Sequence, residues 1–293
     1  MAGSRKKWIA RSFSVLLLPF LFSCNHYFYY PDRNLYFPYQ KTGYAAREVH
    51  FSAQDGNKLY GWFFPSQSQP VQGTVIQFHG NAENLSSHYL SLVWLTQVGY
   101  QLFTFDYRGY GRSEGEADPD GVFLDSLAAL AKAREFHAKL PNSENATLIL
   151  YGQSLGGAIG MRAIAELPKN TSPQLIVLDS TFASYSDIAH KKLKEHWLTW
   201  LFSPLAWLLV SDKYASTESL RANKIPLMVI HDKEDPAVPF SCGQEIFNLA
   251  TAKKDFWVLN EGKHIGVFSQ NHQNHRKLFL QKVQRLLDVS SAN

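Results

Sequence analysis

The sequence has few of the residues that build metal sites or disulfide frameworks. Its 293 residues include only two cysteines, Cys24 and Cys242. One disulfide between them is a formal option, but two cysteines do not make the scaffold of a small disulfide-stapled domain. The sequence has no Cys-x-x-Cys pair, no His-x-x-x-His pair and no Asp-rich calcium loop. It therefore gives no support to a metal site, and we expect no cofactor.

The chain also lacks a strong charge of one sign. Its formal net charge is +4, and several of its basic residues fall within the first eleven positions, at Arg5, Lys6, Lys7 and Arg11. A nucleic-acid-binding domain would carry a basic stripe in its folded part, and the sequence shows none. We therefore expect no nucleic-acid partner.

No apolar run in the N-terminal region is long enough to span a bilayer, which takes about 20 helical residues. A run of near ten residues, 13–22, follows the basic start and precedes Ser23-Cys24. Leu21-Phe22-Ser23-Cys24 resembles a bacterial lipobox, although Phe22 is bulkier than that pattern has. The resemblance implies a lipoprotein signal peptide at 1–23 and lipidation of Cys24. An ordinary signal peptide or an uncleaved anchor is the alternative.

These N-terminal features predict where the protein resides. By resemblance to enterobacterial sorting rules, Asn25 after the cysteine favours the outer membrane over the inner membrane. We therefore expect a lipoprotein of the bacterial cell envelope, held to the membrane through its N-terminal lipid anchor. The alternatives are a secreted or periplasmic protein and one anchored by its N-terminus.

The rest of the chain reads as an N-terminal segment, 24–44, and one α/β domain, 45–293. Strand and helix patterns alternate along this domain, which predicts a mostly parallel central sheet with helices on both faces. Asp55-Gly56 between the first two strands is typical of a hairpin turn. The expected strands are 48–52, 58–64, 74–78, 101–106, 147–151, 175–179, 227–231 and 255–259. The expected helices are a stretch ending at 98, then 121–140, 241–251 and 273–288.

An insertion at about 182–223 interrupts this alternation. It holds Trp197, Trp200 and Trp207, three of the seven tryptophans of the chain. So many large apolar side chains are unlikely to face water uncovered. We interpret the insertion as a small helical cap over the active site, with a membrane-facing surface and ordinary core as alternatives.

A nucleophile motif follows the strand at 147–151. In Gly152-Gln153-Ser154-Leu155-Gly156, the serine sits on a sharp strand-to-helix turn where glycines relieve crowding. A serine hydroxyl is a weak nucleophile near neutral pH, so it needs a base within reach and an acid to orient that base. The motif predicts Ser154 as the nucleophile.

The acid and the base are expected later in the chain, in that order. Asp235 lies in a segment, 231–239, that resembles the Gly-x-x-Asp-x-x-Val-Pro turn of many α/β hydrolases, with Asp232 in place of the glycine. We predict Asp235 as the orienting acid, with Asp232 and Asp179 as rivals. His264 follows the last strand, in the loop position expected for the base.

The other histidines near strand ends or the C-terminus have simpler explanations. His272 and His275 fall near the terminal helix and are expected at the surface, whereas His79 and His231 end strands and suit local packing or hydrogen bonding.

Catalysis would also need two donors aimed at an oxyanion. The backbone N–H of Leu155, directly after the nucleophile, is the first. The loop after strand 74–78 should supply the second from Asn81, because Gly80 lets the backbone approach closely.

Three segments in combination resemble one subgroup of the α/β-hydrolase superfamily over about residues 45–285. They are 78–84 (Phe-His-Gly-Asn-Ala-Glu-Asn), 106–115 (Asp-Tyr-Arg-Gly-Tyr-Gly-Arg-Ser-Glu-Gly) and 179–182 (Asp-Ser-Thr-Phe). This subgroup includes membrane-associated ABHD-type hydrolases, some of them protein depalmitoylases, and bacterial serine-aminopeptidase-like hydrolases. The resemblance implies cofactor-free hydrolysis of esters or thioesters in small-molecule or acylated substrates, through an acyl-enzyme. We expect segment 106–115 to shape a loop beside the pocket.

Two other functions fit the same sequence. An amide or peptide hydrolase would use the same triad, and a non-catalytic binding protein could use the same fold. Non-catalytic relatives usually lose a triad member, whereas this chain has all three candidates.

Overall fold

A computed structural model describes residues 27–195, 197–268 and 273–288. The predicted signal peptide, 1–23, and Cys24 lie outside these residues. Cys242 is buried. Within the described ranges, no helix has both the length and the apolar character that crossing a bilayer requires.

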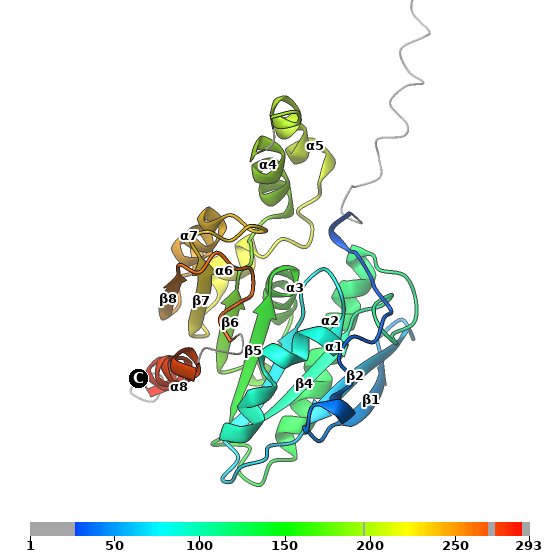
Figure 1. The fold of residues 1–293 in the computed structure, drawn as a ribbon, viewed down its shortest axis with the longest axis vertical. Helices are drawn as coiled ribbons and strands as arrows, with labels where there is room; N and C mark the ends of the chain where they lie inside the picture. Colours follow the sequence, from blue (N-terminus) through cyan, green and yellow to red (C-terminus); the bar gives the residue numbers. More distant parts are fainter. Residues whose placement is uncertain (1–26, 196, 269–272, 289–293) are drawn as a thin grey trace, which may run out of the picture.

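In the described part of the chain, eight strands form one sheet in the order β1-β2-β4-β3-β5-β6-β7-β8. β2 pairs antiparallel with both β1 and β4, and the remaining neighbours pair in parallel. This arrangement confirms the predicted fold class (Figure 1). The strands are β1 (Arg47–Ser52), β2 (Lys58–Phe64), β3 (Gly73–Phe78), β4 (Tyr100–Asp106), β5 (Thr147–Gln153), β6 (Leu175–Asp179), β7 (Leu227–Asp232) and β8 (Lys254–Leu259).

Helices cover both faces of the sheet because successive strand residues point to opposite sides. On β3, Val75 joins one apolar core while Ile76 joins the other. Residues of α2 (Pro119–Ala138), α3 (Leu155–Ile164) and α7 (Phe240–Leu249) pack in the Ile76 core. Residues of α1 (Leu85–His88) and α8 (Gln273–Asp288) pack in the Val75 core.

The predicted helix ending at residue 98 is broken into three short pieces: α1, η4 (Tyr89–Ser91) and η5 (Val93–Val98). Side-chain hydroxyls compete here with the helical hydrogen bonds. The Ser91 hydroxyl donates to the carbonyl of His88 at 2.8 Å, and the Thr96 hydroxyl donates to the carbonyl of Val93 at 2.7 Å. Such local bonds favour tight turns over a continuous α-helix.

The insertion at about 182–223 folds into α4 (Tyr185–Glu195), η7 (Trp200–Leu205), α5 (Ala206–Leu209) and α6 (Thr217–Ala222). α4, η7 and α5 contact one another and project from the body of the domain (Figure 1). α6 returns to pack beside α3 and α7. We call the projecting part, residues 185–209, the cap.

Candidate active site

Ser154 lies on a strained turn between β5 and α3. Its φ of 51° and ψ of −124° place a non-glycine residue in a sparsely populated region. A Cβ on Gly156 would lie 2.3 Å from the carbonyl oxygen of Phe78, and one on Gly152 would lie 2.5 Å from Gly157. The turn therefore depends on glycine at these positions, as the sequence motif predicts.

The structure brings Asp235 and His264 together. Nδ1 of His264 lies 2.8 Å from Oδ2 and 3.0 Å from Oδ1 of Asp235. The backbone N–H groups of Ala237 and Val238 both donate to Oδ1 of Asp235, at 2.8 and 2.9 Å. Burial disfavours the ionised form of this side chain, but the bonds from His264 and the two N–H groups outweigh it, so the pKa of Asp235 lies below its usual value. The carboxylate can therefore hold Nδ1 of His264 protonated.

The two rival acids have other partners. Asp232 accepts the N–H of Glu261 at 2.7 Å and that of Gly262 at 3.2 Å, so it braces the loop that carries His264. Burial opposes its ionisation, but these backbone donors lower the pKa of Asp232. Asp179 accepts the hydroxyl of Tyr151 at 2.9 Å, and burial raises its pKa to about 6.

The other histidines that the sequence singles out make local hydrogen bonds. Nε2 of His231 donates to the carbonyl of Val238 at 2.9 Å and so supports the turn after Asp235. His275 is half-buried, and its Nδ1 donates to the carbonyl of Val267 at 3.1 Å. His272 lies outside the described residues.

The loop after β3, residues 79–84, lies against the nucleophile, and we call it the oxyanion loop after the donor expected from Asn81. A Cβ on Gly80 would lie 3.5 Å from the Cβ of Ser154, which places the Gly80–Asn81 backbone beside the serine. Leu155 opens α3, so its N–H belongs to the first turn of a helix, where backbone donors have no intrahelical partner. Asn81 is tied down through its side chain, whose Oδ1 accepts the N–H of Tyr30 at 2.9 Å. Gly80 and Leu155, on either side of Ser154, thus bring both segments that carry the expected oxyanion donors close to the serine.

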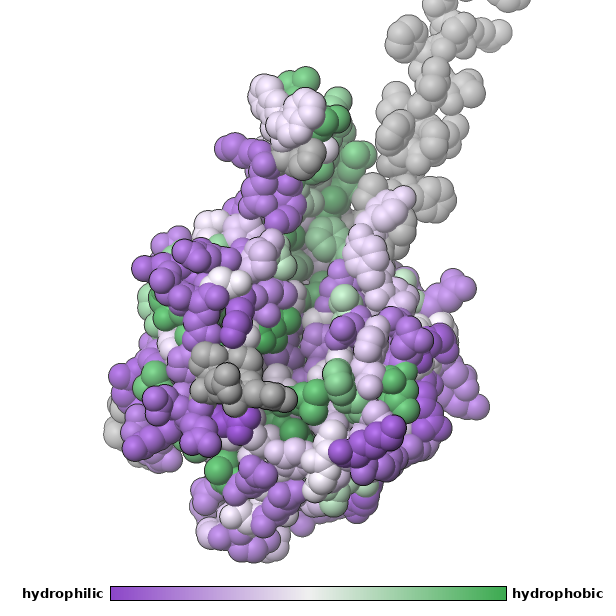
Figure 2. Space-filling view, in the orientation of Figure 1, coloured by the Kyte–Doolittle hydropathy of each residue, from purple (hydrophilic) through white to green (hydrophobic). Residues whose placement is uncertain are grey.

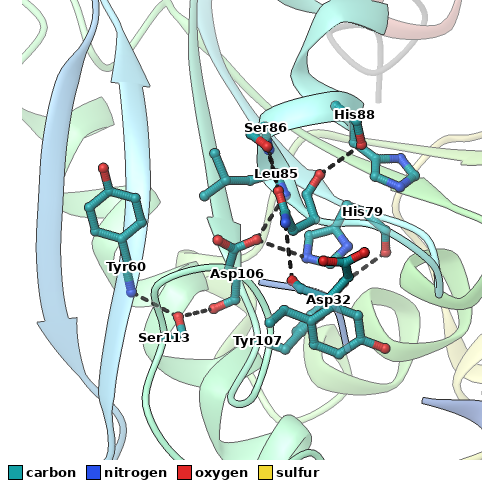
Figure 3. Close-up of polar contacts among 12 residues, drawn as sticks. Asp32, Tyr60, His79, Leu85, Ser86, His88, Asp106, Tyr107 and Ser113 are labelled. Carbon is teal, nitrogen blue, oxygen red and sulfur yellow. Dashed lines mark hydrogen bonds and ion pairs between the residues drawn. The ribbon is translucent and has the colours of Figure 1, made fainter. Parts of the chain in front are cut away.

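A buried polar network lies beneath this loop (Figure 3). Nδ1 of His79 donates to the carbonyl of Gly80 at 2.8 Å, and the Tyr107 hydroxyl donates to the carbonyl of His79 at 3.2 Å. Nε2 of His79 lies 3.6 Å from Oδ1 of Asp106, and the same oxygen accepts the N–H of Leu85 at 2.8 Å. The network therefore holds both ends of the loop that carries Asn81.

Burial sets the protonation of this network. It raises the pKa of Asp106 to about 7 and lowers the pKa of His79 to about 3, because both side chains are enclosed. On the far side, the Ser113 hydroxyl donates to the carbonyl of Asp106 at 2.7 Å and accepts the N–H of Tyr60 (Figure 3). Segment 106–115 thus supports the oxyanion loop from below, closer to the site than the sequence suggests.

Ser154 and His264 line one pocket of about 600 Å³. Its walls come from the oxyanion loop, the cap and the first described residues of the chain. Most of the lining side chains are apolar or aromatic, and Glu83 and Lys192 bring the charges. The apolar lining includes Tyr27, Phe28, Phe182, Ile188, Val238 and Ile265.

Two residues of this pocket escape the sequence reasoning. His88 lies in the pocket wall and donates from Nε2 to the carbonyl of Ala82 at 3.0 Å, so it also holds the oxyanion loop. Burial lowers the pKa of His88. Ile265, next to His264, has a φ of 54°, which is rare for a β-branched residue. No local sequence pattern indicates the hydrogen bond of His88 or the backbone conformation of Ile265.

Comparisons with known proteins agree with this architecture. A family model described as serine aminopeptidase, S33 (Hydrolase_4) matches residues 69–222. The uncharacterized protein YfhR of Escherichia coli K12 is 34% identical over 265 residues, which cover 89% of this chain and 86% of YfhR. The lysophosphatidylserine lipase ABHD12 of Mus musculus is 27% identical over 196 residues, covering 62% of this chain and 46% of ABHD12.

Solved structures share the fold at low sequence identity. The Pyrococcus furiosus esterase Pf2001 superposes with a TM-score of 0.67 at 21% identity, covering 89% of this chain and 97% of the esterase. Acetyl xylan esterase 1 of Thermoanaerobacterium superposes with a TM-score of 0.62 at 17% identity, covering 88% of each chain. At these identities, the likeness establishes the fold.

Proposed function

Because the chain belongs to the serine aminopeptidase S33 family of the α/β hydrolases, we propose that it is a serine hydrolase acting on acyl esters or thioesters. The observation that carries the proposal is the pocket of about 600 Å³, in which Ser154 and His264 meet a mainly apolar wall. Such a wall suits an acyl chain and leaves few polar groups to bind a polar substrate.

The reaction follows from the hydrogen bonds of His264. Since Asp235 holds its Nδ1–H, the free lone pair lies on Nε2, which takes the proton of Ser154 as Oγ attacks the acyl carbon. The oxyanion of the tetrahedral intermediate accepts hydrogen bonds from the backbone N–H groups of Leu155 and Asn81. Nε2 then gives the proton to the departing alcohol or thiol, which leaves Ser154 acylated. Water, deprotonated by the same Nε2, attacks the acyl carbon. Nε2 then returns the proton to Oγ of Ser154 as the acid is released.

A fluorophosphonate probe tests the nucleophile directly. The wild-type chain should be labelled at Ser154, and the Ser154→Ala variant should not be labelled. The other serine at the end of a central strand, Ser180, gives a matched control, because Ser180→Ala should keep the label. A folded wild-type protein that stays unlabelled would refute the enzymatic proposal.

The acyl preference is tested by a series of p-nitrophenyl esters. Medium-chain esters should be cleaved faster than the acetyl ester, because a longer chain buries more apolar surface in the pocket. A flat or reversed chain-length profile would contradict an acyl-binding pocket.

An amide substrate is the second candidate, since Glu83 is an acidic side chain in the described pocket wall and could bind a substrate ammonium group. Aminoacyl-amide turnover above ester turnover, reduced by Glu83→Gln, would favour it over the ester proposal.

The N-terminal features support a membrane location for this activity. We propose that Cys24 is lipidated after removal of residues 1–23 and that the protein is held at the bacterial outer membrane. Metabolic labelling with a palmitate analogue should mark the wild type and not the Cys24→Ser variant. Recovery of unlabelled wild-type protein in the soluble fraction would contradict the anchor.

A further inference from the structure

The cap exposes a cluster of large apolar side chains to solvent. Leu208 is 79% exposed and Trp207 is 57% exposed, although both lie in a helix. We call this cluster the cap patch. Its members are Trp197, Leu198, Trp200, Leu201, Phe202, Leu205, Trp207 and Leu208.

The pattern of burial in this segment is the reverse of that in a water-facing helix. The residues that pack inward are small, with Ser203 only 4% exposed and Ala206 only 3% exposed. His190 of α4 stacks on one side of Trp207 with ring centroids 4.1 Å apart, yet more than half of this tryptophan stays exposed. A helix that turns its small residues toward the protein and its large apolar residues outward is built to contact an apolar phase.

The charge along the segment supports the same conclusion. Between Glu195 and Asp212 the sequence has no acidic residue, lysine or arginine. Lysines lie at its borders, with Lys194 exposed at the end of α4 and Lys213 exposed after α5. An uncharged stretch rich in tryptophan and leucine matches the composition of segments that lie in a membrane interface.

The position of the N-terminal segment indicates that the apolar phase in contact with the cap patch is a lipid bilayer. Phe28 packs against Tyr185 at the base of the cap, with ring centroids 5.1 Å apart. The described chain therefore begins beside the base of the cap, where Tyr27 and Tyr30 are 64% and 60% exposed. Cys24, the proposed lipid attachment site, lies three residues before Tyr27 in the sequence. Any membrane attachment through that residue brings the cap toward the bilayer.

From these observations we propose that the cap patch inserts into the interfacial layer of a lipid bilayer. Figure 2 shows hydrophobic side chains on the projecting cap, at the same end of the molecule as the first described residues. The pocket lies between that cap and that segment, since Ile188 and Phe28 both line it. Docking therefore places the pocket entrance at the membrane surface. The insertion itself does not depend on hydrolase activity.

Quenching of tryptophan fluorescence by lipid tests the insertion in the full-length chain. The vesicles contain phosphatidylethanolamine and phosphatidylglycerol, with bromine on the acyl chains as the quencher. Of the other tryptophans, Trp62, Trp94 and Trp257 are buried at 3%, 3% and 6% exposure, and Trp8, in the proposed signal peptide, is common to all the variants. The variant W197F/W200F/W207F keeps the patch apolar and removes its fluorescence. We expect brominated vesicles to quench at least twice the fraction of emission in the wild type that they quench in this variant.

A second pair of variants separates insertion of the patch from attachment through the N-terminus. In L201E/L208E, quenching should fall to the level of the triple phenylalanine variant. The control V258E/L278E introduces the same charges at exposed apolar positions on β8 and α8 and should keep wild-type quenching. Ser154→Ala should also keep it, so a failure of insertion is distinguishable from a failure of the proposed activity.

Equal quenching of the wild type and the triple phenylalanine variant would overturn the proposal. So would full quenching in L201E/L208E. A second copy of the chain is the competing occupant of the patch. A dimer in sedimentation velocity that L201E/L208E dissociates, together with wild-type emission that brominated vesicles leave unchanged, would assign the patch to self-association instead.

Discussion

Replacing Asp235 with asparagine should trap His264 in the wrong tautomer. The backbone N–H groups of Ala237 and Val238 both donate to Oδ1. An asparagine must therefore keep its oxygen at that position and place its NH₂ group where Oδ2 now lies, 2.8 Å from Nδ1 of His264. Because that NH₂ group can only donate, Nδ1 must accept and the ring proton must move to Nε2. A protonated Nε2 cannot take the proton of Ser154.

The expected loss is large in activity and small in stability. An exchange of this kind in a serine triad lowers kcat by about 10⁴, which corresponds to about 5 kcal/mol of activation free energy. The melting temperature should change by no more than about 2 °C, because both N–H groups keep their acceptor. Asp235→Ala removes that acceptor as well and should also destabilise the fold, by about 1–3 kcal/mol, because the part-buried N–H of Val238 is left unpaired.

Hydrolysis of a p-nitrophenyl ester and thermal unfolding, measured on the same preparations, check this reasoning. Asp235→Asn should be nearly inactive with an unchanged melting temperature, and Asp235→Ala should lose both activity and stability. If Asp235→Asn keeps more than about a tenth of the wild-type kcat, the hydrogen bond between Asp235 and His264 does not set the tautomer that catalysis uses.

Three further predictions concern the surroundings of the site. Burial raises the pKa of Asp106 from 3.8 to about 7, so the folded state binds this proton more tightly than the unfolded state and stability falls as pH rises through that window. Measured by urea denaturation, the free energy of unfolding of the wild type should fall by roughly 2–3 kcal/mol relative to that of Asp106→Asn between pH 5 and pH 8. The same dependence of this free energy on pH in both proteins would contradict the prediction. Gly156→Ala places a Cβ 2.3 Å from a backbone oxygen and should destabilise the protein by at least about 3 kcal/mol. In the control Gly160→Ala, the Cβ meets only side chains, the methyl groups of Leu150 at 3.1 Å and the ring of Phe78 at 3.3 Å, and the variant should cost about 1 kcal/mol. Equal urea midpoints of the two variants would refute the close contact at Gly156. Asp232→Ala removes the acceptor of two backbone N–H groups in the loop that carries His264, and it should lower kcat more than it raises KM. An unchanged kcat would show that these two hydrogen bonds are not needed to position His264.

The parts of the fold and site that the sequence predicts are those with local signals. Each central strand is a short apolar run bounded by turn residues, so the strand order along the chain could be read directly. The Ser154 turn is specified within five residues, because glycine is required where the backbones of β3 and α3 meet. Asp235 and His264 each follow a strand, and parallel strands bring their carboxyl ends to one edge, which made their meeting predictable.

The parts that escaped prediction depend on contacts between distant segments. The link from Asp106 to His79 joins the ends of two neighbouring strands, and neither residue alone indicates that the other holds its loop. His88 bonds to the oxyanion loop from the end of α1, and no local sequence pattern indicates this contact. The outward orientation of the cap tryptophans was not predictable either, because the sequence shows how many tryptophans the insertion has but not whether their side chains face the solvent or the protein.

Buried aspartates at strand ends explain how such a strained site stays in place. β4 ends in Asp106, which accepts a backbone N–H from the segment after the oxyanion loop. β7 ends in Asp232, which accepts two from the loop that carries His264. Each bond to the ionised Asp232 contributes about 1.5–3 kcal/mol, and the bond to Asp106, whose pKa burial raises to about 7, contributes about 0.5–1.5 kcal/mol while that group is neutral. One residue in a strained conformation costs about 1–3 kcal/mol. The bonds that these aspartates accept can thus offset the strain at Ser154 and Ile265, so the loops that bear the candidate catalytic groups are held by side chains that take no part in the proposed chemistry.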